Sequence, residues 1–316
     1  MSLRVVFVFL DGVGLGPADV VAPDGAPGNP FAALALPAME RLGGGQRWTD
    51  ALRPVRRPGH VVVPLDATLG VEGLPQSGTG QTALFTGRNA AARHGAHYGP
   101  TPPTTVRDWI DHESLFAHQA RRDGADTLAF ANAFPDRFFE VMEARGRWTA
   151  TTRMARGAGV RLRRAADLRA GEALAADLTG AGWRDAFDPT LAVLDEAEAG
   201  RRLARLSTAH RLTLFEYFLT DKAGHAQDAA RAAGVLGALD RFLGALVEAL
   251  DPTRDLLVLT SDHGNLEDLS TRSHTRHPVP LVAWGAGAEA FADAASLLDV
   301  TPAVRRVLAS SAAASP

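Results

Sequence analysis

The sequence predicts an α/β fold, in which a doubly wound, mainly parallel sheet is interrupted by a small inserted cap. Three apolar runs, beginning near Val5, Leu212 and Leu256, have the length and composition of strands buried on both faces. Each run ends abruptly in polar residues, and helical stretches lie between the runs along the chain. Alternation of buried strands with helices is typical of a parallel sheet that is covered on both sides.

The composition excludes several classes of protein. With 316 residues, the chain is long enough for one large α/β domain. A formal net charge of −3 provides no basic surface for nucleic acid or for an anionic membrane, so we expect neither partner. The absence of cysteine excludes disulfides and thiolate ligands, and it suits a reducing cytoplasm. Any metal ion must therefore be held by oxygen and nitrogen atoms.

The N-terminal part begins with a strand and continues mainly as loops. Arg4–Leu10 is the first core strand, and a glycine-rich turn, Asp11–Gly14, follows it. Asp11 is either a site residue at a strand end or a cap of the next helix. One short helix is expected around Phe31–Leu42. Val61–Val63 is a short strand, which Pro64 should end or confine to a sheet edge.

A second polar stretch, GLPQSGTGQTALFTGRNAA at residues 73–91, leads into a helix. Ser77 and Thr79 lie at or just before its N-terminus, where backbone amides and the helix dipole favour an anion. It is not a phosphate-binding P-loop, because Thr79 and Gly80 stand where that motif requires Lys and Ser or Thr. From residue type alone, Ser77 is an ordinary helix cap or a functional hydroxyl.

The middle of the chain departs from the alternation of strands and helices. His112–Asp123 fits an amphipathic helix and Asp126–Ala131 a following strand. Residues 132–194 contain Arg-rich pieces with no clear alternation, so we expect them to form an inserted cap or lid. The metal-binding α/β core domain then comprises residues 1–131 and 195–316.

The regular pattern returns in the C-terminal third. Glu196–Ala209 is expected to be a helix, Leu212–Leu219 a buried strand, and Ala226–Leu250 a long helix with an apolar face. Between the last two, Asp221 and His225 are four residues apart, which places them on one face of a helix. Such a pair alone is more often a surface contact between neighbouring turns.

The last polar stretch follows the strand that begins near Leu256. Asp262 and His263 stand side by side where this strand ends, and His274 and His277 follow in a loop. The chain then returns in a further apolar run, Leu281–Trp284. The carboxyl ends of strands in open α/β sheets are the usual place for ligands, and carboxylates with neutral imidazoles are ligands that zinc and manganese accept.

Acids at the ends of three strands, with imidazoles beside them, predict one shared metal centre. The number of ligands suffices for two cations, which can clamp the attacking and leaving oxygens of a displacement at phosphorus. Coordination to a dication would also make a serine hydroxyl such as that of Ser77 nucleophilic. Lys222, the only lysine, and Arg88 could each hold a substrate phosphate or carboxylate, or lie on the plain surface.

These motifs resemble the alkaline phosphatase superfamily, and within it the branch of cofactor-independent phosphoglycerate mutase and phosphopentomutase. The resemblance lies in DGVG at 11–14, DKAGH at 221–225, SDHGN at 261–265 and HTRHPVP at 274–280. It covers roughly the two outer thirds of the chain and leaves the middle unmatched. It implies an alkaline-phosphatase-like core.

The resemblance also implies roles for individual residues. One metal ion would be bound by Asp11, Asp262, His263 and the nucleophile. A second would be bound by Asp221, His225 and His274. His274 is preferred to His277 because the family's ligand precedes the Thr of the HT pair. Ser77 is preferred to Thr79 because the nucleophile of this branch stands ten residues before the glycine of a Gly-Arg pair, here Gly87.

The expected activity is two-metal phosphoryl transfer through a phosphoserine at Ser77, with manganese or zinc, or else magnesium, as the metal. The substrate would be a small phosphorylated metabolite, and hydrolysis of a phosphomonoester is favoured. The segment QSGTGQ lacks the acid and imidazole of the NSEVGH-like segment in phosphoglycerate mutases, and the insertion is much shorter than theirs. A phosphomutase, a phosphodiesterase or sulfatase, and a non-catalytic protein that binds a phosphorylated ligand are the alternatives. The sequence gives no oligomeric state.

Overall fold

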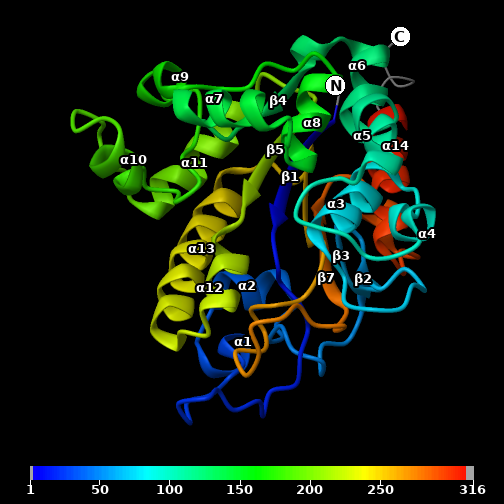
Figure 1. Cartoon of the computed structure of the whole chain (residues 1–316), viewed down its shortest axis with the longest axis vertical. Coiled ribbons are helices and arrows are strands. Elements are labelled where there is room, and N and C mark those ends of the chain that lie inside the picture. Colours follow the sequence, from blue (N-terminus) through cyan, green and yellow to red (C-terminus); the bar gives the residue numbers. More distant parts are fainter. Residues whose placement is uncertain (1–2, 311–316) are drawn as a thin grey trace.

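The computed structural model describes residues 3–310, which are organised around one seven-stranded sheet (Figure 1). The strands are β1 (Arg4–Leu10), β2 (Val55–Arg57), β3 (His60–Leu65), β4 (Leu128–Phe130), β5 (Leu212–Tyr217), β6 (Asp255–Ser261) and β7 (Val279–Gly285). Their order across the sheet is β2-β3-β7-β6-β1-β5-β4. β1, β4, β5 and β6 are parallel, β7 runs against β6, and β3 runs against β7. Five strands therefore share one direction, which confirms the predicted mainly parallel sheet.

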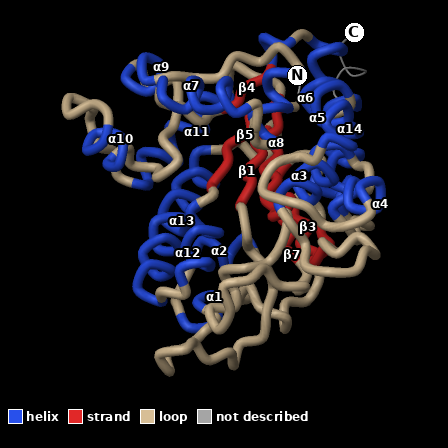
Figure 2. Tube along the Cα trace, viewed as in Figure 1, coloured by secondary structure: helices blue, strands red, loops and turns tan. Residues whose placement is uncertain are grey.

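Helices cover both faces of the sheet, as a doubly wound fold requires (Figure 2). One face packs on α1 (Pro30–Ala33), α2 (Pro37–Leu42), α11 (Glu196–Ser207), α12 (Leu219–Ala226) and α13 (Ala229–Ala249). The other packs on α3 (Ser77–Thr86), α4 (Ala90–His94), α5 (Arg107–His112), α6 (Leu115–Asp123), α8 (Ala150–Gly157) and α14 (Val300–Ser310). Alternate residues of β1 enter the two cores: Val5 and Phe7 enter one, Val6 and Val8 the other.

Short 3₁₀ turns connect these elements: η1 (Thr104–Val106), η2 (Ala125–Thr127), η3 (Ala288–Phe291) and η4 (Leu297–Asp299). The helix expected over Phe31–Leu42 is two helices, because the chain turns to an extended backbone at Leu34 and a new helix begins at Pro37. The helix expected over His112–Asp123 is also divided, since the Ser114 side chain accepts from Ala117 N and begins α6 anew.

The prediction that Pro64 ends the third strand or confines it to an edge is wrong. β3 is an inner strand that continues through Pro64 to Leu65. β2 pairs only with His60 to Val62, so Pro64 lies beyond that ladder, and on the other side it stands opposite Pro280 of β7. Because no neighbour needs an amide hydrogen at this position, the proline is tolerated.

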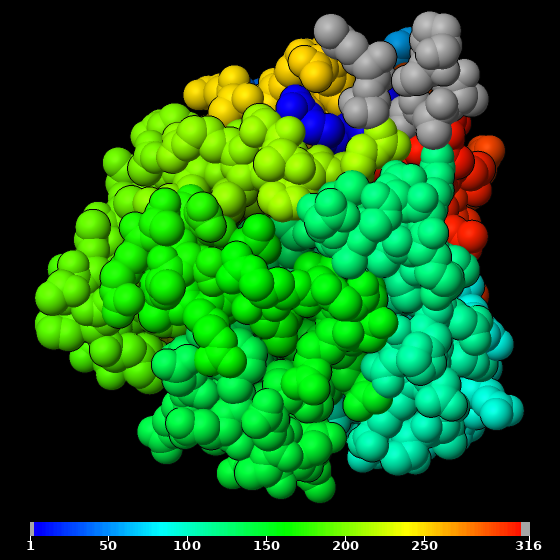
Figure 3. All heavy atoms as spheres, turned by 90° about the horizontal axis from the view of Figure 1, so that it is seen from above, coloured from blue at the N-terminus to red at the C-terminus, as the bar shows by residue number. Residues whose placement is uncertain are grey.

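Residues 132–194 lie in two environments. The helices of this segment are α7 (Asp136–Arg145), α8, α9 (Ala165–Arg169) and α10 (Ala181–Ala186). α8 packs against α5 and α6 and is part of the main core. The rest forms a small core of its own, made by Ala133, Leu168, Ala173, Ala175, Trp183 and Leu191. Seen from above, the green spheres of this segment make up much of one face (Figure 3).

None of the helices in residues 3–310 has the length and apolar character needed to cross a bilayer.

Candidate metal centre

Three neighbouring strands deliver the predicted acids to one edge of the sheet. β1 lies between β5 and β6, with Leu10 opposite both Tyr217 and Ser261. Asp11 follows β1 directly, Asp262 follows β6, and Asp221 stands in the first turn of α12, which begins just after β5. The parallel register therefore brings together carboxylates that are up to 251 positions apart in the sequence.

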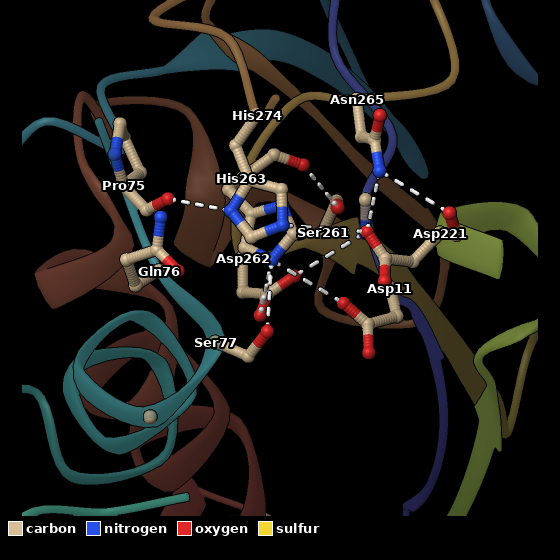
Figure 4. A network of polar contacts seen from close by, with 12 residues as sticks. Asp11, Pro75, Gln76, Ser77, Asp221, Ser261, Asp262, His263, Asn265 and His274 are labelled. Carbon is tan, nitrogen blue, oxygen red and sulfur yellow. Dashed lines mark hydrogen bonds and ion pairs between the residues drawn. The ribbon is translucent and has the colours of Figure 1, made fainter. Parts of the chain in front are cut away.

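Ser77 is the first residue of α3, and Gln76 is its N-cap. The Ser77 hydroxyl makes no capping hydrogen bond. It points to the acids, with Oγ at 3.0 Å from His263 Nε2 (Figure 4). The positive end of the α3 dipole lies at the same place. Of the two roles left open for Ser77, the geometry supports the functional hydroxyl.

Backbone carbonyls fix the tautomers of two imidazoles. His274 Nδ1 lies 2.8 Å from Pro75 O, and His225 Nδ1 lies 2.6 Å from Arg272 O. Since a carbonyl can only accept, both Nδ1 atoms carry the hydrogen and both Nε2 atoms keep a free lone pair. Metal-binding histidines are commonly oriented by this kind of bond on the second nitrogen.

The Nε2 atoms of all three imidazoles lie close to the carboxylates. His263 Nε2 lies 3.4 Å from Asp11 Oδ1 and 3.5 Å from Asp262 Oδ2. His225 Nε2 lies 3.3 Å from Asp221 Oδ2, and His274 Nε2 lies 3.6 Å from Asp221 Oδ1. Two groups have ligand atoms that all lie within 4.8 Å of one another: Asp11, Asp262 and His263 form one, and Asp221, His263 and His274 form the other.

His263 joins the two groups. Its ring is stacked on that of His274, with centroids 3.8 Å apart and planes 17° from parallel. His225 Nε2 lies 3.3 Å from His274 Nε2, so the third imidazole also reaches the second group. The structure thus brings together all seven residues predicted as ligands: Asp11, Ser77, Asp221, His225, Asp262, His263 and His274.

Without a metal ion, burial makes it costly to ionise the carboxylates and imidazoles of this cluster. It raises the pKa of Asp11 well above its ordinary value, with the charges of Asp262 and Asp221 adding to the effect. Burial also raises the pKa of Asp262 to about 7, and Asp221 contributes. The pKa of His263 falls to about 3, through burial and then the neighbouring His274. A dication would reverse the shifts of the two carboxylates, because it favours their ionised form, and it would reinforce the neutral state of His263.

The unsatisfied atoms also fit a metal ion. Asp11 Oδ1 and Asp262 Oδ2 are buried and accept no hydrogen bond from residues 3–310. Buried carboxylate oxygens without donors are uncommon in folded proteins. The donor set consists of oxygen and imidazole nitrogen only, which are ligand atoms that divalent metal ions accept in proteins.

Two further residues of the motifs have a structural role beside the ligands. Gly12 has φ of +69°, and a Cβ there would lie 2.7 Å from Asp221 Oδ1. A glycine is therefore needed for β1 to approach Asp221 this closely. Asn265 of the SDHGN segment donates to the carbonyl oxygen of Asp221 and, at 2.7 Å, to its Oδ1. The amide thereby holds the carboxylate in place.

Glu267 is a buried hub behind the centre. Its Oε2 accepts from Gly14 N and from Asn265 N, both at 2.8 Å. Its Oε1 accepts from the Thr275 hydroxyl and lies 3.0 Å from His277 Nδ1. The three loops that carry Asp11, Asp262 and His274 are therefore bonded to one carboxylate. His277 pairs with this hub, which raises its pKa, and it does not join the ligand cluster.

The other residues predicted for the site, Thr79, Lys222 and Arg88, lie in three different surroundings. Thr79 is fully buried and its hydroxyl accepts from Tyr98 N at 3.1 Å, so it faces away from the acids. Lys222 lines a cavity beside Ser77. Of the two roles left open for Arg88, its contacts support the surface role: its guanidinium stacks on Trp109 at 3.7 Å and pairs with Glu113. Arg88 follows Gly87, which ends α3, so the length of that helix lies between it and Ser77.

Sequence reasoning missed Glu216, Asn265 and Glu267. Glu216 is buried in the wall of the same cavity and accepts from Thr151 at 2.7 Å. Burial raises its pKa to about 7. An acid inside the apolar run LTLFEYFL was a usable signal for Glu216. Nothing in the residue pattern distinguished Glu267 from a surface acid.

Fold and site together define an α/β protein with an alkaline-phosphatase-like core and a candidate centre for divalent metal. Residues 192–311 match the model of the Metalloenzyme superfamily. The phosphopentomutase of Chromohalobacter salexigens is 41% identical over 101 residues, which are 32% of this chain and 22% of that protein. The chain thus matches about a fifth of the length of that relative.

Solved structures share the fold. A phosphoglycerate mutase of Leishmania mexicana is 14% identical, with a TM-score of 0.51 and coverage of 98% of this chain and 95% of that chain. An alkaline phosphatase mutant of the Antarctic bacterium TAB5 is 13% identical, with a TM-score of 0.50 and coverage of 98% of both chains. The predicted resemblance to the alkaline phosphatase superfamily and its mutase branch is confirmed. The family match and the residue groups support use of divalent metal.

Proposed function

We propose that this protein hydrolyses small phosphomonoesters through a phosphoserine formed at Ser77. The observation that carries the proposal is the position of Ser77 Oγ, which lies at the N-terminus of α3 and 3.0 Å from His263 Nε2 within the cluster of acids and imidazoles. The match to metalloenzymes that include a phosphopentomutase supports the same class of chemistry. A cytoplasmic location and a small phosphorylated metabolite as partner belong to this proposal.

Two divalent ions, manganese or zinc with magnesium as the alternative, would bind here. Asp11, Asp262, His263 and Ser77 would hold one ion, and Asp221, His225 and His274 the other. When bound, such ions make the serine hydroxyl more acidic and neutralise charge on the phosphoryl oxygens. Phosphate monoesters need accelerations of up to about 10²¹, which an unaided serine cannot supply.

The residues of the chain have complementary tasks. Ser77 Oγ forms a bond to phosphorus as the bond from phosphorus to the alcohol oxygen breaks, and the serine proton passes to water. The departing alcohol takes a proton from water. A second water then cleaves the bond between Ser77 and phosphorus, which releases phosphate and restores the hydroxyl. The first turn of α3 stabilises the phosphoryl oxygens through its dipole, and Lys222 lines the same cavity as Ser77.

Phosphomutase activity is the second candidate, because the similarity to phosphopentomutase favours it. It requires that the phosphoserine return its phosphoryl group to the same substrate. Incubation with a pentose phosphate separates the two: isomerised pentose phosphate indicates a mutase, and free phosphate indicates a hydrolase.

Mass spectrometry tests the proposal directly. The metal-loaded protein is incubated with a phosphomonoester, quenched in acid and digested, and we expect a phosphate adduct on Ser77. Ser77→Ala should lose the adduct and at least about 10³-fold in kcat, while its metal content stays within about a factor of two.

Thr79→Val is the matched control, because Thr79 is the neighbouring hydroxyl of the same helix. It should keep the adduct and most of the activity, although it loses the bond from Tyr98 N. Undiminished turnover in Ser77→Ala, or an adduct on Thr79, would refute the assignment of Ser77.

A further inference from the structure

A cavity of about 440 Å³ opens beside Ser77. One side of it belongs to the metal centre, through Asp11, Ser77 and Asp221. The other side comes largely from residues 132–194. The cavity is within the range of volumes that bind small molecules. A second cavity beside Ser77, which includes Arg272, is lined by the proposed metal ligands Asp221, His225 and His274. The group esterified to a phosphate held at Ser77 would therefore extend into the cavity that lacks these imidazoles.

Much of the apolar lining of the cavity is aromatic. Phe134, Phe138, Trp183 and Phe218 all line the cavity. Phe134 and Phe138 are stacked with ring centroids 4.5 Å apart, and Trp148 supports Phe138 edge-on at 5.9 Å. Trp183 is anchored in the small core of the insertion and is only 7% exposed. The apolar wall is therefore held in place by its own packing.

The polar side chains of this wall have partners within the protein. Asn132 donates to Glu216 O and accepts from Glu216 N. Thr149 caps α8, and the carboxylate of Glu216 accepts from Thr151. These groups bond to one another, so they offer little hydrogen bonding to a polar substrate.

Positive charge is scarce in the cavity. The chain has 33 basic residues, yet among residues 3–310 the lining includes no arginine and only one cation, Lys222. Its ammonium lies 4.5 Å over the ring of Phe218 and pairs with no carboxylate in the described part of the chain. One cation can accompany one phosphoryl group. A second phosphate or a carboxylate deeper in the cavity would lose water without gaining a counter-ion.

We propose that the substrates of this site are phosphate monoesters of apolar, flat alcohols or phenols that carry no second anionic group. This inference rests on the proposed phosphatase activity and names its substrate class. The aromatic body lies against the rings that line the cavity, Phe138 and Trp183 among them, where its faces and edges meet other rings. Phosphorylated hydroxy acids and pentose phosphates fit the cavity poorly, because their hydroxyls and carboxylates face rings.

The test compares kcat/KM for 1-naphthyl phosphate, 3-phosphoglycerate, ribose 5-phosphate and ethyl phosphate. Wild-type protein loaded with manganese should prefer 1-naphthyl phosphate to 3-phosphoglycerate by at least 100-fold. Phe138→Ala should raise KM for 1-naphthyl phosphate about tenfold and leave KM for ethyl phosphate within twofold. Trp183→Phe, which keeps an aromatic ring in the small core, should raise it about threefold.

Phe139→Ala is the matched control, because Phe139 is the next residue of α7 and does not line the cavity. Its KM values should stay within twofold of wild type. Equal or better turnover of 3-phosphoglycerate or ribose 5-phosphate, with a phosphate adduct on Ser77, overturns the substrate class and leaves the phosphatase proposal standing. An unchanged KM for 1-naphthyl phosphate in Phe138→Ala also overturns it. Absence of any Ser77 adduct with all four esters overturns the phosphatase proposal and this inference with it.

Discussion

Replacement of Glu267 tests whether one buried carboxylate holds the loops of the metal centre together. Two variants of similar size separate its roles. In Glu267→Gln, the amide oxygen can still accept from Gly14 N and Asn265 N, while the amide nitrogen donates to Thr275 Oγ1 and to a neutral His277. Glu267→Met keeps the volume but offers no acceptor to either backbone amide.

The expected losses of stability differ accordingly. In the Met variant two buried amides lose their acceptor, at about 1–3 kcal/mol each, and the Thr275 hydroxyl loses a bond of about 1 kcal/mol. We therefore expect the free energy of unfolding to fall by about 3–7 kcal/mol. The Gln variant loses only the charge of the acceptor, so we expect about 1–2 kcal/mol.

The loss of stability in the Gln variant should also depend on pH, and it should be larger at low pH. Glu267 raises the pKa of His277 in the folded protein. The pair therefore stabilises the fold fully below the unfolded pKa of about 6.5, and this contribution is lost as pH rises through the folded value. The difference between wild type and Glu267→Gln should be larger at pH 6 than at pH 8.5.

Urea denaturation followed by tryptophan fluorescence, in the presence of a chelator, measures these differences without a contribution from bound metal. Thr275→Val is the matched control, because it removes one donor to the same carboxylate and should cost about 1 kcal/mol. If Glu267→Met proves no less stable than Glu267→Gln, the two backbone amides do not depend on Glu267 and the hub interpretation fails.

Three further predictions concern the metal centre and its surroundings. His274→Ala should lose bound metal in elemental analysis while His277→Ala retains it, and equal loss in both would contradict the assignment of His274 as the ligand. Metal at about 100 times its dissociation constant should add about 2.7 kcal/mol to the free energy of unfolding, and an unchanged thermal midpoint after chelation would count against a metal site. Burial raises the pKa of Glu216 from 4.5 to about 7. Between pH 4.5 and about 7 the folded state therefore keeps a proton that the unfolded state has lost. The chelated protein should therefore lose up to about 3 kcal/mol of stability as pH rises through this interval, and Glu216→Gln should remove that part of the slope.

The sequence predicted the parts of the site that depend on strand ends. Buried strands are recognisable by their apolar runs, and parallel strands place their carboxyl ends together, so the meeting of Asp11, Asp221 and Asp262 followed from local pattern. Arg88 shows the limit of such reasoning, because residue type left its role open and only its contacts with Trp109 and Glu113 support a surface position. A position close in sequence to Ser77 lies at the far end of a rigid helix.

Other features depended on contacts between distant segments. Pro64 is tolerated only because β2 is too short to reach it, and the sequence does not state the length of that pairing. The role of Glu267 arises from donors on three loops, so its residue type alone carried no information. The aromatic cavity wall likewise combines Phe218 after β5 with rings of the insertion, which have no common spacing along the chain.

The way residues 132–194 are attached has a consequence for the history of the site. Bridges from Asn132 to Leu174 and from Ala133 to Arg163 tie both limbs of the segment to the chain just beyond β4. All seven ligand candidates lie outside that tethered excursion. Mutations in this segment can therefore reshape the substrate cavity while the metal ligands and Ser77 stay unchanged. Such changes give the protein a route to new ester substrates that keeps the same chemistry.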